Sequence, residues 1–218
     1  MKNAVVYIHG KGGSADEALY YKKFFNDDYE LLGFNYKSEL PWQADEEFQN
    51  YFDSIIPNYN KILLIANSIG AYFSMLSLSE KPIKKALFVS PIVDMENIIL
   101  HMMKRARISE EKLRLKKIIN IPFGEPLSWE YLSFVRKNPI AWNIPTGILY
   151  GKKDDMTSLE TMTNFANKIH ADLTVFDNGE HWFHTEEQMN FLDTWFIVFF
   201  FGGFPHFVSV RKSIKQIF

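Results

Sequence analysis

The chain has 218 residues, 47% of them hydrophobic, which suits a single domain with a sizeable core. Its formal net charge is −2, so no broad basic surface is expected for nucleic acid or for an anionic membrane. It contains no cysteine, which excludes disulfides, thiolate catalysis and cysteine-based metal sites, and which is easiest to reconcile with a reducing cytoplasm.

The first half of the chain predicts strands that alternate with helices. The opening MKNAVVYIHG reads as a strand and not as a signal peptide, because His9 and Gly10 interrupt a short apolar run. A glycine-rich loop follows, and the capping box Ser14-Ala-Asp-Glu17 starts a helix. Strands are expected at 4–8, 29–34, 61–66 and 86–89, and further helices at 45–56 and 70–78.

The second half continues this alternation. Strands are expected at 147–150 and 173–176, each followed by a helix with a capping box, Thr157-x-x-Glu160 and Thr185-x-x-Gln188. Six strands alternating with helices of this length indicate an α/β fold, a mostly parallel sheet with helices on both faces. We interpret residues 1–218 as one domain.

Two segments depart from the alternation. Residues 92 to about 140 replace a crossover helix with a longer stretch of charged residues and helically spaced apolar residues, and we expect a small helical cap insertion. Residues 197–218 form an atypical apolar tail, in which the uninterrupted apolar run is far shorter than the ~20 residues needed to span a bilayer.

A serine stands where the third strand meets its helix, in Ala66-Asn67-Ser68-Ile69-Gly70. The pattern is close to G-x-S-x-G, the sharp turn that lifts a nucleophilic serine above a sheet and places the next N–H at a helix N-terminus. Alanine at the first small position is a mild departure. Alone, this match is also typical of an ordinary strand-to-helix turn.

Three further segments follow strands in the same way. His9-Gly10-Lys11-Gly12-Gly13 follows the first strand, Gly151-Lys-Lys-Asp154-Asp155 the fifth, and Asn178-Gly179-Glu180-His181 the sixth. Taken singly, these are also typical of a flexible turn, a helix N-terminal charge and a structural histidine. Together they lie at the carboxyl edge of the sheet, where open α/β sheets bind ligands, in the order serine, acid, histidine.

In these segments the chain resembles the α/β-hydrolase superfamily. HGKGG is similar to its oxyanion loop, ANSIGA to its nucleophile elbow, YGKKDD to its acid turn and GEHWFHTEEQ to its histidine loop. The resemblance covers roughly residues 4–196 and is weakest in the cap.

The resemblance implies a role for each matching residue. Ser68 would be the nucleophile, His181 the general base and then acid, and Asp154 the residue that orients the histidine. The backbone N–H groups of Lys11 and Ile69 would form the oxyanion hole. Asp155 and, more distantly, Asp94 remain alternatives for the acid, and Gly12 remains an alternative for Lys11.

The activity implied is that of a serine hydrolase, and we expect a carboxylesterase that cleaves small to medium acyl esters through an acyl-enzyme. Alternatives are a peptidase or thioesterase with the same triad, or a catalytically silent module that binds ligands. No metal or other cofactor is required, and no nucleic-acid partner is expected. The substrate-binding residues and the oligomeric state are left open, although the cap supplies apolar candidates for a pocket lining: Met102, Met103, Phe123, Trp129, Tyr131 and Phe134.

Overall fold

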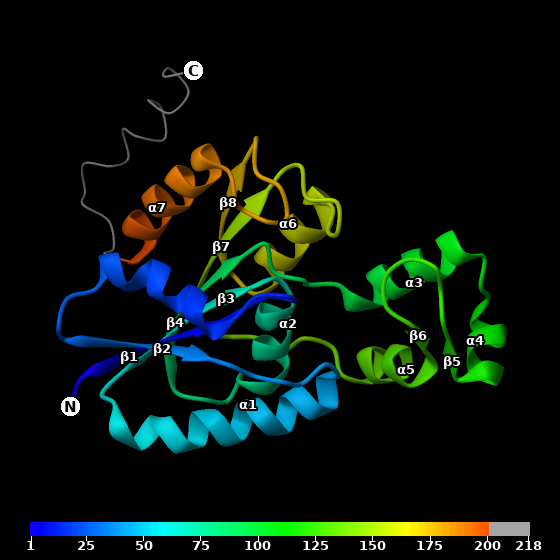
Figure 1. Cartoon of the computed structure of the whole chain (residues 1–218), viewed down its shortest axis with the longest axis horizontal. Coiled ribbons are helices and arrows are strands. Elements are labelled where there is room, and N and C mark those ends of the chain that lie inside the picture. The colour runs from blue at the N-terminus through cyan, green and yellow to red at the C-terminus, as the bar shows by residue number, and fades with distance from the viewer. Residues whose placement is uncertain (201–218) are drawn as a thin grey trace.

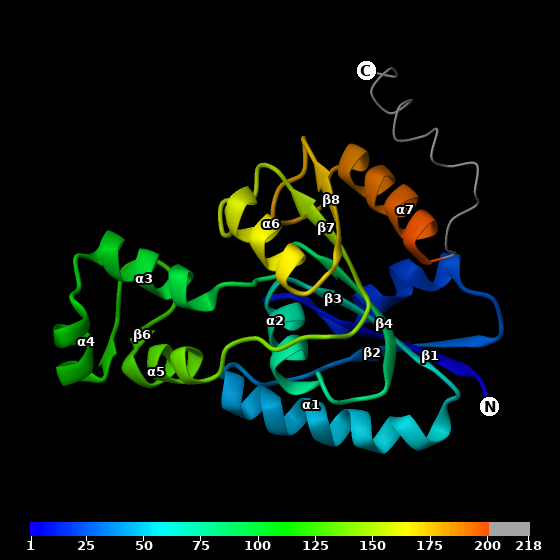
Figure 2. The same ribbon diagram turned by 180° about the vertical axis from the view of Figure 1, so that it is seen from behind.

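The computed structural model describes residues 1–200, whose main feature is a six-stranded sheet with parallel pairing throughout (Figures 1 and 2). Its spatial order is β2-β1-β3-β4-β7-β8. The strands are β1 (Asn3–Ile8), β2 (Tyr29–Phe34), β3 (Ile62–Asn67), β4 (Ile83–Val89), β7 (Thr146–Gly151) and β8 (Asp172–Phe176). Each overlaps one predicted strand, so the prediction of an α/β fold with a parallel sheet is confirmed.

The strand side chains divide between two apolar layers, because successive residues of a strand point to opposite faces. In β1, Ala4, Val6 and Ile8 lie in one buried cluster, whereas Val5 and Tyr7 lie in the other. Both faces of the sheet are therefore buried, as parallel sheets require.

Helices cover both faces. Helices α1 (Pro41–Ile55), α2 (Ser68–Ser77) and α6 (Leu159–Lys168) contribute buried residues to one layer. The 3-10 helix η1 (Ala15–Phe24) and helix α7 (Glu186–Phe200) contribute to the other. Helix α1 begins at Pro41, earlier than the predicted residue 45, since proline at the first helical position needs no hydrogen-bond acceptor. A short 3-10 turn, η2 (Ile56–Asn58), follows it and contains Pro57.

Two of the three predicted capping boxes are present. Ser14 and Glu17 cap η1 reciprocally, and the side chains of Thr185 and Gln188 each accept a backbone N–H of the other. The prediction for α6 is wrong by one residue, because Ser158 is the N-cap. Thr157 instead belongs to the preceding loop, where its carbonyl accepts the Tyr150 hydroxyl at 2.6 Å.

The segment expected to form a cap stands as a lobe at the carboxyl end of the sheet (Figures 1 and 2). It contains helices α3 (Met95–Ala106), α4 (Glu110–Lys116) and α5 (Trp129–Lys137). It also contains an antiparallel two-stranded ribbon of β5 (Ile118–Ile119) and β6 (Leu127–Ser128), which the sequence did not indicate. The lobe has buried apolar residues of its own on each of these helices: Ile99, Met103, Leu113 and Leu132.

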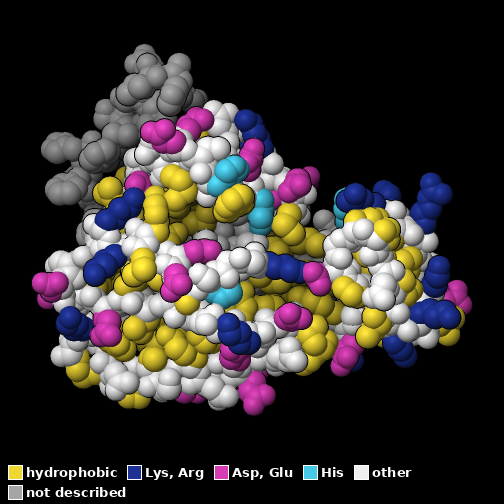
Figure 3. Space-filling view, viewed as in Figure 1, with side chains coloured by type: hydrophobic (Ala, Val, Ile, Leu, Met, Phe, Trp, Pro, Cys, Tyr) yellow, Lys and Arg dark blue, Asp and Glu magenta, His cyan; other side chains and the backbone are white. Residues whose placement is uncertain are grey.

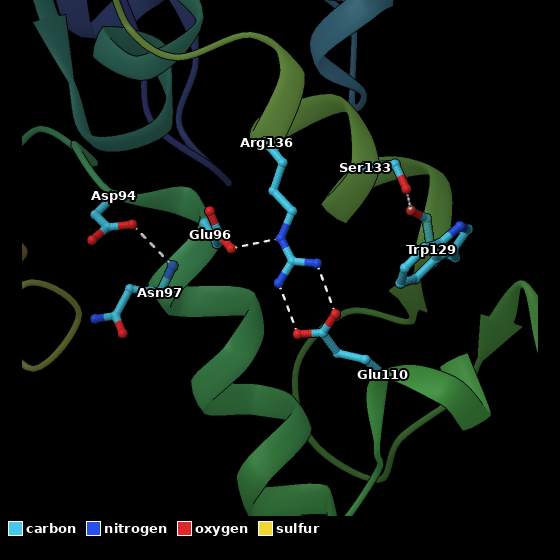
Figure 4. Close-up of polar contacts among 7 residues, drawn as sticks. All are labelled: Asp94, Glu96, Asn97, Glu110, Trp129, Ser133 and Arg136. Atoms are coloured by element: carbon cyan, nitrogen blue, oxygen red, sulfur yellow. Dashed lines mark hydrogen bonds and ion pairs between the residues drawn. The ribbon is translucent and has the colours of Figure 1, made fainter. Parts of the chain in front are cut away.

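Charged side chains join the helices of the lobe (Figure 4). The Arg136 guanidinium on α5 donates two hydrogen bonds of 2.7 Å to the Glu110 carboxylate of α4 and one of 2.6 Å to Glu96 of α3. We call these three residues the Arg136 clamp. Asp94 caps α3 by accepting the Asn97 N–H at 2.9 Å.

An extended segment carries the chain back from the lobe to β7. Its Trp142 side chain is buried, lies 5.6 Å from the Phe88 ring and donates a hydrogen bond of 2.7 Å to Thr146 Oγ1. Trp142 therefore covers β4 where a crossover helix would usually pack.

The last helix closes the second layer. Phe196 of α7 is fully buried among Tyr21, Phe24 and Phe25, and Phe200 packs on Phe25. The part of the predicted tail at residues 201–218 lies outside the described residues. Within residues 1–200, no helix combines the length and the apolar character needed to cross a membrane.

Candidate active site

The turn between β3 and α2 holds Ser68 in an unusual conformation. The strand ends at Asn67 and the helix starts at Ser68, with no loop between them. Ser68 has a φ of 49°, a left-handed conformation that costs energy in a residue with a Cβ. Gly70 allows the helix to start this close to β1, because a Cβ there would lie 2.3 Å from the His9 carbonyl oxygen.

A continuous hydrogen-bonded array links three side chains from separate loops. Ser68 Oγ lies 2.8 Å from His181 Nε2, and His181 Nδ1 lies 2.7 Å from Asp154 Oδ2. The three residues follow β3, β8 and β7 respectively. The structure thus brings together the serine, histidine and acid that the sequence placed at the carboxyl edge of the sheet.

Asp154 is held in one orientation by its own loop. Its side chain has no exposed surface, and its Oδ1 accepts the N–H groups of Met156 and Thr157 at 2.8 and 3.1 Å. These bonds leave Oδ2 directed at the histidine. The alternatives lie elsewhere: Asp155 is exposed, and Asp94 caps helix α3.

Two glycines let the acid loop and the histidine loop touch. A Cβ at Gly151 would lie 2.5 Å from the Glu180 carbonyl oxygen, and one at Gly179 would lie 2.7 Å from the Gly151 Cα. The Lys153 N–H also donates to the Gly179 carbonyl at 2.8 Å. Any larger side chain at either glycine would separate Asp154 from His181.

The glycine-rich loop after β1 packs beside Ser68. Its Gly13 N–H donates to the Gly10 carbonyl at 3.2 Å, and Gly12 has a φ of 76°, as the third residue of a type II turn requires. A Cβ at Gly10 would lie 3.3 Å from the Ser68 Cβ, so Lys11 follows a point of direct contact with the serine turn. Ile69 lies in the first turn of α2, where backbone N–H groups have no acceptor within the helix.

The neighbouring histidines have other contacts. His9 is buried, stacks on Tyr36 at 4.4 Å and bonds to its own loop at the Gly10 carbonyl. His184 is exposed, stacks on Trp182 at 4.5 Å and lies 3.7 Å from the Glu180 carboxylate. His9 therefore helps to shape the glycine-rich loop, and His184 lies at the surface.

One contact of this region joins residues that are far apart in the sequence. The Lys11 ammonium forms an ion pair with Glu125, an exposed residue of the lobe. Their separation of 114 residues leaves no local pattern from which the pair could be predicted. Apolar side chains also gather where the lobe meets the body, whereas basic side chains line the outer part of the lobe (Figure 3).

Neither a family model nor a curated protein sequence matches the chain. Solved structures do match. Mouse alpha/beta hydrolase domain-containing protein 10 aligns with a TM-score of 0.66 at 12% identity, over 99% of this chain and 90% of that one. Est1E from Butyrivibrio proteoclasticus with bound ferulic acid aligns with a TM-score of 0.66 at 13% identity, over 88% and 86%. Pyrococcus furiosus esterase PF2001 aligns with a TM-score of 0.59 at 20% identity, over 89% and 78%.

These likenesses extend over most of both chains in each pair. The protein therefore has the α/β-hydrolase fold, which it shares with esterases. At such low identity the comparison defines the fold alone, and function has to be argued from the site.

Proposed function

We propose that the protein is a serine carboxylesterase that hydrolyses small to medium acyl esters through an acyl-enzyme. The observation that carries the proposal is the array Ser68–His181–Asp154, in which each hydrogen bond is shorter than 3 Å. A nucleophile, a base within reach and a group that orients the base are the parts that nucleophilic catalysis needs.

The acylation half follows from this geometry. Ser68 Oγ attacks the carbonyl carbon of the ester while its proton passes to His181 Nε2. The oxyanion of the tetrahedral intermediate accepts hydrogen bonds from the backbone N–H groups of Ile69 and Lys11. The Asp154 carboxylate stabilises the imidazolium that His181 becomes. The intermediate then collapses, the C–O bond to the alcohol breaks, and His181 gives its proton to the leaving alcohol.

The deacylation half repeats these steps with water. His181 takes a proton from water as the water oxygen attacks the acyl-serine. Collapse of the second tetrahedral intermediate releases the carboxylic acid and returns the proton to Ser68 Oγ. The enzyme needs no redox partner for either half.

Aromatic side chains pack together where the lobe meets the body, and we propose that this region receives the acyl or aryl part of the substrate. Trp42 at the start of α1 lies 6.2 Å from the Tyr131 ring and 5.5 Å from the Phe134 ring of the lobe. The solved structure of Est1E contains ferulic acid, an aryl acid. We expect water-soluble aryl esters of short to medium acids to be better substrates than long-chain triglycerides, because a lobe of three short helices presents little apolar surface to a lipid droplet.

A fluorophosphonate probe tests the proposal, since it reacts with an activated serine. Wild-type protein should be labelled at Ser68, as mass spectrometry of the peptide would show, and Ser68→Ala should not. Ser68→Ala should also lower ester hydrolysis by at least about a thousandfold. Activity of Ser68→Ala within tenfold of the wild type would remove Ser68 from the mechanism.

A substrate series then separates the types of hydrolase. We expect kcat/KM for p-nitrophenyl esters, from acetate to palmitate, to be highest at short to medium chains. The matching anilides and thioesters distinguish a peptidase or a thioesterase. A maximum at the longest chains, with a jump in rate when droplets form, would indicate a lipase, and an unlabelled serine would indicate a silent binding module.

A further inference from the structure

A chain of hydrogen bonds runs behind the glycine-rich loop and joins it to the serine turn. Asn67 Nδ2, next to the candidate nucleophile, donates to the Tyr7 hydroxyl at 2.8 Å. The Tyr7 hydroxyl donates to Glu17 Oε2 through a short hydrogen bond. Glu17 Oε1 accepts the backbone N–H of Ser14, the residue that follows the loop, at 3.2 Å.

The direction of each hydrogen bond in this chain is defined. Tyr7 is 1% exposed, and burial raises the pKa of its phenol far above the usual range, so the hydroxyl stays protonated. Its single proton goes to the Glu17 carboxylate, which leaves an oxygen lone pair for the Asn67 amide. Asn67 Oδ1 is buried without a protein partner, so the bond to Tyr7 is what orients this amide.

These hydrogen bonds run beside the glycine-rich loop, whose own backbone has little rigidity. Three of its four residues from Gly10 to Gly13 are glycine, which restricts the backbone least. One end of the loop packs on Ser68 at Gly10. The other end packs on Glu17, whose Oε1 would lie 2.6 Å from a Cβ at Gly13.

We infer that Tyr7 and Glu17 are positioning residues, which hold the Lys11 N–H at the height above Ser68 that the tetrahedral oxyanion requires. The inference rests on the proposed function. Neither side chain touches the substrate; both act through the loop and through Asn67. Their loss should therefore weaken binding of the transition state while leaving binding of the ground-state ester unchanged.

Tyr7→Phe tests this directly, because it removes one hydroxyl and keeps the buried ring. Removing an oxyanion donor costs about 10²–10³ in kcat, so displacing one should cost less, about tenfold. We expect kcat/KM for p-nitrophenyl butyrate to fall about tenfold with KM within twofold of the wild type. The inhibition constant of phenylboronic acid, which forms a tetrahedral adduct with an active serine, should rise by the same factor.

Tyr20→Phe is the matched control. Tyr20 lies on the same helix as Glu17, and its hydroxyl also donates a short hydrogen bond to a carboxylate, that of Asp193, but away from the loop. The Tyr20→Phe variant should lower thermal stability as Tyr7→Phe does. It should leave kcat/KM and the inhibition constant of phenylboronic acid within twofold of the wild type. Glu17→Gln, which keeps a capping residue at this position, provides a second variant if Tyr7→Phe fails to fold, with the same fall in kcat/KM expected.

The outcomes separate this inference from the proposed function. If the wild type hydrolyses esters and binds the boronate but Tyr7→Phe and Glu17→Gln match it within twofold, the positioning role is wrong and the esterase proposal stands. If Tyr20→Phe loses as much as Tyr7→Phe, the effect is one of general stability and the positioning role is again wrong. A wild type that neither hydrolyses esters nor reacts with the fluorophosphonate overturns both.

Discussion

Ser68 stores backbone strain at the point where the candidate chemistry takes place. A left-handed conformation costs a residue with a Cβ about 1–2 kcal/mol, and glycine avoids that cost. Glycine loses about 0.5–1 kcal/mol to chain entropy in ordinary backbone. We expect Ser68→Gly to exceed Ser68→Ala in free energy of unfolding by about 0.5–1 kcal/mol, as urea denaturation would show.

Ser74 serves as the control for this comparison, because it is buried inside helix α2. At this position the free energy of unfolding of Ser74→Gly should be lower than that of Ser74→Ala by about 1 kcal/mol. The same order of stability at both positions would show that the Ser68 conformation is not strained.

The enclosure of Asp154 leads to a second prediction. Asp154→Asn keeps the shape but places an amide where a carboxylate faces His181 Nδ1, so the imidazole is held in the wrong tautomer. We expect kcat to fall by about 10³–10⁴. Asp155→Asn, at an exposed neighbour, should stay within twofold of the wild type in the same assay. A larger loss for Asp155→Asn would mean that the acid is wrongly assigned.

For individual residues, the sequence indicated which side chains of the candidate site meet, but not which hydrogen bonds hold the surrounding loops in place. Parallel strands end at one edge, so motifs after the first, third, fifth and sixth strands predicted the meeting of Ser68, Asp154 and His181. Tyr7, in contrast, looks like any apolar residue of a buried strand. Its hydrogen bond to Glu17 depends on the turn of the glycine-rich loop, which no periodicity encodes.

Among the elements, the Arg136 clamp makes the stability of the lobe depend on pH. Hydrogen bonds from Arg136 hold the pKa of the Glu110 carboxyl below its ordinary value of 4.5. A carboxyl whose pKa is lower in the folded state adds stability above the unfolded value and loses it as pH falls through the folded value. The contribution of Glu110 should therefore be present at neutral pH and disappear in acid.

Glu110→Gln tests this contribution. We expect its melting temperature to lie about 1–3 °C below that of the wild type at pH 7, because half-exposed ion pairs contribute little. The difference should shrink as the pH is lowered below 4.5. Glu111→Gln, at an exposed position in the same first turn of α4, controls for the interaction with the helix dipole. Equal curves for the two variants would show that the clamp adds no stability.

Elements with a full hydrophobic period were predictable, and short or irregular ones were not. The six strands alternate between two apolar layers over five to seven residues each. The strands β5 and β6 have two residues each, too few to show a period. The N-cap of α6 is Ser158 and not Thr157, because the Thr157 N–H donates to the Asp154 side chain in the preceding loop, a contact that the capping-box pattern does not encode.

At the scale of the whole molecule, helix α7 packs on the body up to Phe200, the last residue that the structure describes. Phe199 and Phe200 still pack on the body, at Gly147 and Phe25 respectively. We expect a protein that ends at Phe200 to keep its activity and to be more soluble than the full chain, which has an atypical apolar tail. Ester hydrolysis and the soluble fraction after expression measure this.

A second truncation gives the contrast. Ending the chain at Trp195 removes Phe196, which is fully buried, and should cost at least about 3–5 kcal/mol of stability. If the protein that ends at Phe200 also unfolds, the tail contributes to the core and the prediction is wrong.

The lobe has a consequence for how such a protein can change over evolutionary time. The chain enters the lobe at α3 and leaves it after α5, both on the side that faces the body (Figure 1). The helices of the lobe are joined by the Arg136 clamp (Figure 4), and each has buried apolar residues. Trp142, which follows the lobe in the sequence, is buried against Phe88 of β4 and covers the sheet there without any residue of the lobe. Under the proposed function, a change in the lobe would alter which molecules reach Ser68, whereas Asp154 and His181 are held by the loops that follow β7 and β8. Selectivity and chemistry could then be inherited separately.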